Sequence, residues 1–135
     1  AAKNKLIQLI TEHPESYIVI NMGTNSSLTE NEGKKYATLY NNIAAKYPDS
    51  KVVAVSVTQV NHTLAKQNGM YTGINLNDNS VKTFNKGLKN NINNSIMYCD
   101  VYSKMENYNY GTSDGVHYNS DTYKYIYNAI QECLR

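Results

Sequence analysis

Several residue types are scarce in this sequence, and each scarcity excludes a class of protein. Its 135 residues include two cysteines, two prolines, one phenylalanine and no tryptophan, and arginine occurs only as Arg135. Basic residues number 13 against 11 acidic ones, and the lysines are scattered rather than massed. A nucleic-acid binder needs a concentrated basic surface, so no nucleic-acid partner is expected.

Long hydrophobic runs and cysteine motifs are also missing. The longest apolar stretches, residues 17–20 and 52–57, are far shorter than the roughly 20 residues that cross a bilayer, so no membrane span is expected. Cys99 and Cys133 stand apart, with no Cys-x-x-Cys spacing and no histidine pattern nearby. Neither a zinc site nor a disulfide framework is indicated, and two free thiols are expected.

Helix-type and strand-type segments alternate along the chain. Apolar spacing and capping residues predict helices over residues 3–12, 29–47, from Asn77 or Asn79 to 92, and from Asn119 or Ser120 to 134. Short β-branched runs predict buried strands at residues 17–22, 51–57 and 95–99. Residues 58–76 have no clear period and are expected to form a variable loop. The alternation predicts an α/β fold with three layers, α/β/α, and a parallel sheet.

The last predicted helix carries an apolar stripe that is expected to face the core. Its members are Tyr123, Ile126, Tyr127, Ile130 and Leu134.

One loop at the carboxyl end of the predicted sheet places a carboxylate and an imidazole three residues apart. Asp114 and His117 stand between the third strand and the last helix, and ligands of parallel sheets bind at that end. A carboxylate so placed can orient a histidine that acts as a general base. The alternatives are a helix-capping His117 and an Asp114 that only forms a turn, but the strand-end position favours catalysis. His13 and His62 are expected to face solvent.

The loop after the first strand reads Gly23-Thr24-Asn25-Ser26. The glycine suits a tight exit from the strand, and the amide of Asn25 is a neutral donor suited to an oxyanion, although such residues also serve as plain turn formers. Tyr108, Tyr110 and Tyr118 cluster around His117 in the sequence and could stack against a sugar ring or an acyl group.

With these two loops the chain resembles the SGNH or GDSL hydrolase family of flavodoxin-like esterases and acyl hydrolases, whose blocks include Gly-x-Asn-Asp and Asp-x-x-His. Asp114-Gly115-Val116-His117 matches the second block, whereas Ser26 stands where the first block usually has aspartate. The resemblance implies a flavodoxin-like fold of the SGNH type. It also implies catalytic roles for His117 and Asp114, an oxyanion-hole role for Asn25, and substrate binding by Gly23, Ser26 and Tyr118.

The nucleophile of the resembled family lies in a Gly-Asp-Ser block, and no such block occurs here. We therefore expect residues 1–135 to form a single SGNH-like domain without its N-terminal strands, with the serine supplied by another segment or by a partner chain. Ser26 and Ser113 are the nearest internal serines, but neither stands in the strand-turn-helix elbow that exposes a nucleophile.

The resemblance implies hydrolysis of carboxylic esters by a Ser-His-Asp mechanism that needs no metal or cofactor. The family's substrates are broad, and the polar, Tyr- and Asn-rich loops favour acetyl or acyl groups on carbohydrate as the substrate. The alternative is an inactive flavodoxin-like module that binds a glycan or a protein. The Asn- and Tyr-rich composition favours an extracellular or cell-surface location, and a cytoplasmic one stays open.

Overall fold

The computed structural model describes residues 17–23, 27–67, 77–112 and 114–134, apart from the side chain of residue 62. Within this part of the chain, strands β1 (Tyr17–Ile20), β2 (Lys51–Val55) and β3 (Met97–Cys99) form a parallel sheet in the order β1-β2-β3. The predicted parallel α/β sheet is confirmed, and the predicted helix over residues 3–12 lies outside the described residues.

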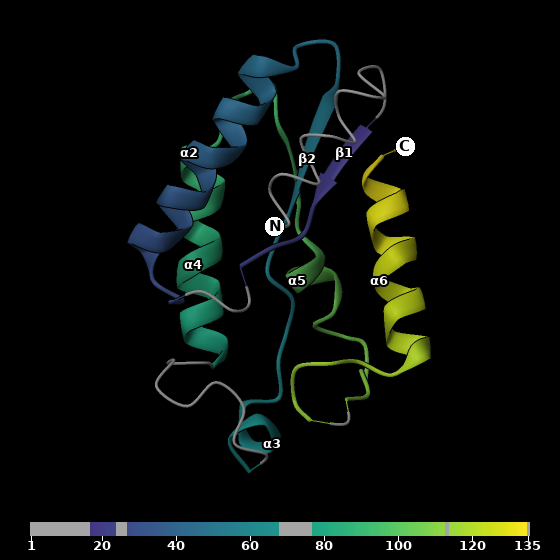
Figure 1. Cartoon of the computed structure of the whole chain (residues 1–135). Coiled ribbons are helices and arrows are strands. Elements are labelled where there is room, and N and C mark those ends of the chain that lie inside the picture. Colours follow the sequence, from purple (N-terminus) through teal and green to yellow (C-terminus); the bar gives the residue numbers. More distant parts are fainter. Residues whose placement is uncertain (1–16, 24–26, 68–76, 113, 135) are drawn as a thin grey trace.

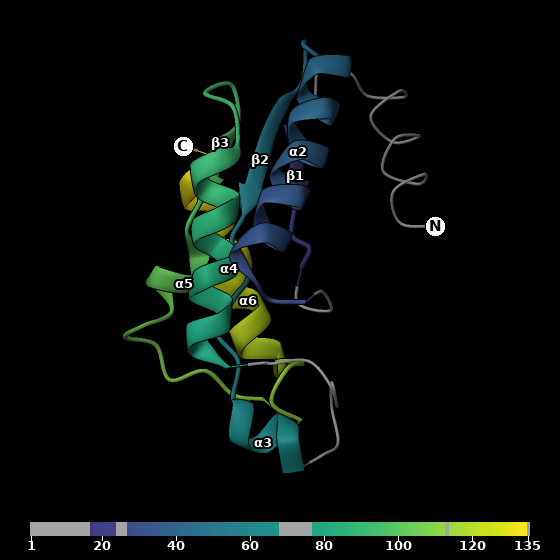
Figure 2. The same cartoon turned by 90° about the vertical axis from the view of Figure 1, so that its left-hand side faces the viewer.

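The helices cover both faces of the sheet. They are α2 (Glu30–Lys46), α3 (His62–Gln67), α4 (Asp78–Asn91), α5 (Val101–Lys104) and α6 (Ser120–Cys133). Helices α2 and α4 lie side by side on one face, and α6 lies on the other (Figures 1 and 2). No helix in the described ranges is long and apolar enough to span a membrane.

Strand β2 is buried on both faces, which explains its uninterrupted apolar sequence. Val52 and Ala54 belong to the core cluster beneath α2 and α4, whereas Val53 and Val55 belong to the cluster beneath α6. Side chains alternate across a strand, so four successive small apolar residues supply both cores. The central strand thereby fixes the three layers.

Side-chain caps start the helices where the sequence predicted. The Thr29 hydroxyl accepts a hydrogen bond from the amide of Glu32 at 3.1 Å, and Asn77 caps α4 through the amide of Ser80 at 2.9 Å. Asn119 caps α6 in the same way. Each cap satisfies an amide that the first helical turn leaves unpaired.

Helices α2 and α4 pack closely because each contributes a glycine. A Cβ at Gly33 would lie 2.1 Å from the carbonyl oxygen of Phe84, and a Cβ at Gly87 would lie 2.1 Å from that of Glu30. No side chain fits at either contact. The pair seats Phe84, which is fully buried, beneath the end of β1.

Two short helices were missed by the sequence prediction. Helix α3 lies within residues 58–76, which were predicted to be a loop, and α5 directly follows β3. With six and four residues, both are too short to show an apolar period. Each nevertheless begins at a side-chain cap, Asn61 for α3 and Asp100 for α5.

The predicted burial of Tyr123 and Tyr127 is wrong, because 49% and 62% of these residues are exposed. Helix α6 turns Thr122, Ile126 and Ala129 toward the sheet instead. The two tyrosines occupy a neighbouring flank of the helix, where Tyr123 packs edge-on against Tyr118 and Tyr127 is the more exposed of the two.

The expectation of two free thiols is also wrong, since Cys99 and Cys133 form a disulfide. Their Cα atoms lie 5.8 Å apart, within the usual range for a disulfide. Packing of α6 against β3 brings together two cysteines that are 34 residues apart, a proximity that spacing alone does not reveal.

Candidate active site

The loop after β1 begins with a glycine that no other residue can replace without strain. Gly23 has a φ of +121°, and a Cβ there would lie 2.8 Å from Cζ of Phe84 and 3.0 Å from Cγ2 of Val57. The carboxyl ends of β1 and β2 therefore meet closely at this point. Asn25 and Ser26 lie outside the described residues, so their predicted roles stay predictions.

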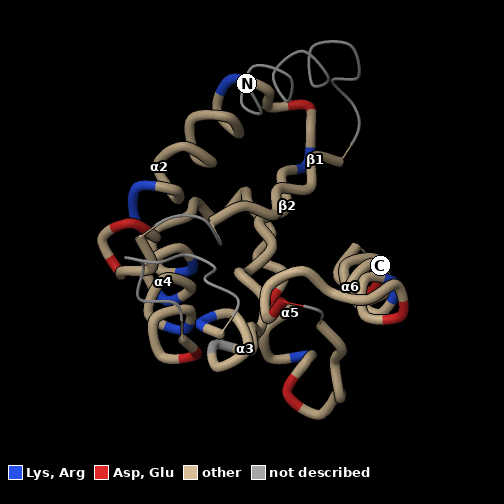
Figure 3. Tube along the Cα trace, turned by 60° about the horizontal axis from the view of Figure 1, so that its bottom comes forward, with Lys and Arg blue, Asp and Glu red and all other residues tan. Residues whose placement is uncertain are grey.

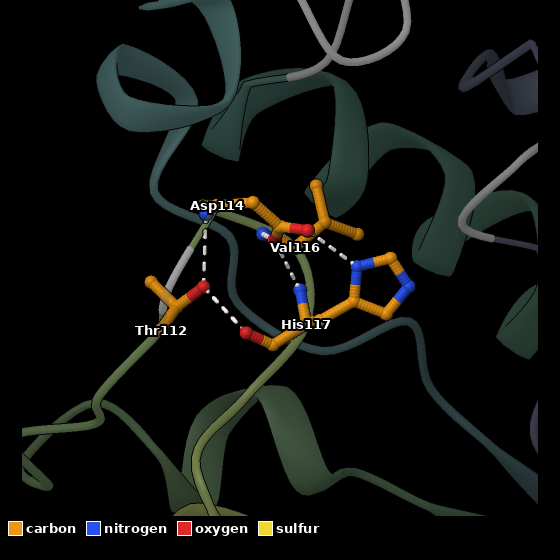
Figure 4. A network of polar contacts seen from close by, with 5 residues as sticks. Thr112, Asp114, Val116 and His117 are labelled. Atoms are coloured by element: carbon orange, nitrogen blue, oxygen red, sulfur yellow. Dashed lines mark hydrogen bonds and ion pairs between the residues drawn. The ribbon is translucent and has the colours of Figure 1, made fainter. Parts of the chain in front are cut away.

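Asp114 and His117 are in direct contact. Nδ1 of His117 lies 2.6 Å from Oδ2 of Asp114 (Figure 4). The His117 side chain is 62% exposed and that of Asp114 only 25%. The loop thus holds one ring nitrogen against the carboxylate and leaves the imidazole open to an incoming group.

The second oxygen of Asp114 is held by the backbone of the same loop. Oδ1 accepts hydrogen bonds from the amides of His117 at 2.7 Å and Val116 at 2.9 Å. These two bonds, followed by the one from the His117 ring, lower the pKa of Asp114 to about 2. An ionised carboxylate only accepts hydrogen bonds, so Nδ1 of His117 carries a proton, and Nε2 is the ring nitrogen that faces away from Asp114.

Thr112 and Gly115 brace the turn. The Thr112 hydroxyl accepts a bond from the Gly115 amide at 2.9 Å and donates to the His117 carbonyl at 2.7 Å (Figure 4). Gly115 has a φ of +96° and lies against α3, where its carbonyl accepts a bond from the Asn61 amide at 2.9 Å. Helix α3 is therefore a support of the Asp-x-x-His turn. The sequence prediction missed this helix, although Asn61, a residue type that commonly caps helices, was a detectable signal of its start.

Tyr118 anchors the end of the turn to the loop after β2. Its hydroxyl donates to the carbonyl of Gln59 and accepts from the hydroxyl of Thr58 at 2.6 Å. Burial raises the pKa of Tyr118 to about 12. Its ring packs edge-on against Tyr110 and Tyr123. The predicted contact with substrate stays a prediction, and any such contact would involve the ring rather than the engaged hydroxyl.

The other two tyrosines of this loop, Tyr108 and Tyr110, lie apart from each other. Tyr108 stacks on Tyr125 of α6, with ring centroids 3.9 Å apart, whereas Tyr110 lies beside Tyr118.

The described residues contain no cluster of three or more His, Cys, Asp or Glu side chains that could hold a metal ion.

Comparison with known proteins identifies the family. The sequence profile of the GDSL-like lipase/acylhydrolase family matches residues 2–130. A solved structure from Streptococcus pneumonia, provisionally named a platelet activating factor, has a similar fold, with a TM-score of 0.73 and 17% identity. The match covers 89% of this chain but 60% of that one, so the chain spans less than two thirds of its neighbour. No curated protein matches the sequence. The resemblance noted in the sequence is confirmed, and the chain belongs to the GDSL-like lipase/acylhydrolase family.

Proposed function

We propose that this chain supplies the histidine and aspartate of a serine ester hydrolase site. The observation that carries the proposal is the Asp114–His117 pair, with 2.6 Å between Nδ1 and Oδ2 and an exposed imidazole. Asp114 fixes the tautomer and the direction of the ring. Nε2 of His117 is then the general base.

The chemistry follows from the positions of the protons. Nε2 takes the proton of a serine hydroxyl as its oxygen attacks the ester carbonyl, and the imidazolium returns that proton to the leaving alcohol. Water then releases the acyl group by the same route in reverse. Asp114, ionised at neutral pH, stabilises the imidazolium in both halves.

The oxyanion that forms on the carbonyl needs a donor, and Asn25 is our candidate for that role. Gly23 lies close to the strand ends, and Asn25 and Ser26 stand two and three positions after it in the sequence. For the substrate, we propose an acetyl or acyl ester on carbohydrate.

The nucleophile is the part that the described residues do not provide. Every hydrogen bond of His117 in the described part of the chain goes to Asp114 or Thr112. We propose that the serine comes from a separate segment or a partner chain that docks beside β1. Strand β1 is the edge of the described sheet, and its Tyr17 and Val19 are 55% and 38% exposed.

The exposed flank of α6 favours the same docking surface. Val19 pairs in register with Val53, which lies in the core beneath α6, so Val19 is on the α6 face of the sheet. Tyr125 reaches α5, where its hydroxyl donates to the Lys104 carbonyl at 2.7 Å. Tyr127 follows two positions later and projects from the opposite flank, toward the β1 side. An added strand and helix would cover both surfaces.

Hydrolysis of p-nitrophenyl acetate tests the proposal. The chain would be assayed alone and with a serine-bearing strand–helix segment from a family member. We expect activity in the combined sample, and His117→Ala should lower it about 100- to 10,000-fold because the general base is lost.

Three controls define the result. His13→Ala should leave the rate of hydrolysis unchanged. His117→Ala should leave the midpoint of urea unfolding nearly unchanged, because the His117 side chain is exposed. A segment in which alanine replaces the serine should give no activity. Hydrolysis that survives His117→Ala would refute the mechanism, and no hydrolysis with any serine segment would favour an inactive binding module.

A further inference from the structure

A groove runs between α4 and α5 and is separate from the Asp114–His117 pair. It encloses about 470 Å³, a volume typical of small-molecule sites. Its lining is Lys82, Asn85, Lys86, Lys89, Asn90, Tyr98, Asp100, Tyr102, Ser103 and Glu106. Lysines, amides and tyrosines dominate this lining, so the groove suits a polar and negatively charged ligand.

The three lysines lie in a row along α4. Their spacing of four and three residues puts them on one flank of the helix, over a rise of roughly 10 Å. Basic residues recur along α4 in Figure 3. The row therefore presents regularly spaced cations, on the length scale of one or two sugar rings.

Aromatic rings hold both ends of this lysine row. Nζ of Lys82 lies 5.8 Å from the ring centre of Tyr102, and Nζ of Lys89 lies 5.8 Å from that of Tyr98. Such contacts orient an ammonium group without neutralising its charge. Lys86, between them, forms no ion pair with any described residue.

The acidic residues of the groove, Asp100 and Glu106, offset two of its three lysine charges and leave a surplus of one positive charge. Asp100 is engaged as the cap of α5, accepting bonds from the Ser103 amide at 3.1 Å and the Ser103 hydroxyl at 2.7 Å. Glu106 lies at the rim and has no ion pair within the described ranges. Charges of both signs inside one groove favour a ligand that carries hydroxyl groups as well as anions.

The groove and the candidate active site share a support. The side-chain amide of Gln59 donates to the Tyr102 carbonyl at 3.1 Å, and the Gln59 carbonyl accepts from the Tyr118 hydroxyl. Tyr118 directly follows His117, so one residue connects the wall of the groove to the Asp-x-x-His turn.

We propose that the α4–α5 groove binds an anionic carbohydrate, with Lys82, Lys86 and Lys89 facing its carboxylate or other acidic groups. That this carbohydrate carries the ester cleaved at His117 rests on the proposed function, whereas the binding itself does not. A single-stranded nucleic acid is the competing occupant. It is disfavoured because the two tyrosine rings that could stack on bases, those of Tyr102 and Tyr98, are each covered by a lysine ammonium group.

Calorimetric titration with tetragalacturonic acid tests the groove. The chain should bind this probe more tightly than neutral maltotetraose, and affinity should fall as salt rises. The triple variant Lys82→Gln, Lys86→Gln, Lys89→Gln should weaken binding about tenfold, as expected for the loss of three exposed ion pairs. A matched triple variant, Lys34→Gln, Lys46→Gln, Lys124→Gln, removes the same charge elsewhere and should change the dissociation constant less than about twofold.

The outcomes separate the groove from the esterase. No binding of tetragalacturonic acid, an equal loss in both triple variants, or tighter groove-dependent binding of a short oligo(dT) would each overturn the proposal. Binding is read without hydrolysis, so a chain that binds through the groove but cleaves no ester with any serine-bearing segment would count against the proposed function alone.

Discussion

The substitution Gly115→Ala tests whether α3 supports the Asp-x-x-His turn. An alanine at the φ of +96° is disfavoured by roughly 1 to 2 kcal/mol. Its Cβ would lie 2.4 Å from the Ala65 nitrogen and 2.5 Å from the Asn61 carbonyl oxygen, which are backbone atoms that cannot rotate away. Such overpacking costs about 1 to 3 kcal/mol. Lower entropy of the unfolded chain offsets about 0.4 to 1 kcal/mol, so we expect a net loss of about 1 to 4.5 kcal/mol.

Urea denaturation measures this loss as a lower midpoint at an unchanged slope. Gly111→Ala is the matched control. Its Cβ would meet Nδ2 of Asn119 at 2.1 Å, but that amide ends a flexible side chain, so the loss should be limited to the α6 cap, about 1 kcal/mol. Faster hydrogen exchange at the Asn61 amide, which donates to the Gly115 carbonyl, should accompany Gly115→Ala alone. If Gly115→Ala lost no more stability than Gly111→Ala and left hydrogen exchange at the Asn61 amide unchanged, the inference that α3 supports the turn would be refuted.

Three further perturbations act on other parts of the structure. Cys133→Ser removes the disulfide and should lower the free energy of unfolding by roughly 4 kcal/mol in a urea titration; the same midpoint for wild type with and without reductant would argue against it. Asn85→Ala leaves the buried amide and carbonyl of Val57 without their partners and should cost about 2 to 4 kcal/mol, also measured in urea. Asp114 has a folded pKa of about 2 against an ordinary 3.8, so its ionised form stabilises the fold above about pH 4, and this contribution is lost as the pH falls toward 2. The stability difference between wild type and Asp114→Asn should shrink over that window, and a constant difference would contradict the shift.

The layers of the fold were predictable because long periodic segments dominate them. Helices α2, α4 and α6 are capped by Thr29, Asn77 and Asn119, and each of these polar caps precedes an apolar stripe. The first two strands were predicted too long at their carboxyl ends, since β1 stops at Ile20 and β2 at Val55. Ser56 and Val57 stay buried after the pairing ends, so their burial resembles that of a strand.

The contact between Asp114 and His117 follows from local spacing, which is why the sequence could suggest it. What holds that contact is not local. Gly115 lies against Asn61, and the Tyr118 hydroxyl reaches Gln59, so both supports join segments more than fifty residues apart. The disulfide between Cys99 and Cys133, which are 34 residues apart, is likewise a contact that local spacing does not reveal. Each depends on how α3 and α6 pack, which sequence periodicity does not determine.

The exposure of Tyr123 and Tyr127, which the sequence predicted to be buried, bears on how the candidate active site would be completed. An apolar stripe normally reports the surface that a helix buries, and on α6 that stripe is wider than the surface the sheet covers. The uncovered part lies on the same side as Tyr17 and Val19, which are also exposed. Replacing Tyr127 and Val19 with serine should therefore weaken docking of a serine-bearing segment while leaving the contact between Asp114 and His117 unchanged. If that double variant bound the segment as well as wild type does, the nucleophile would have to come from another side.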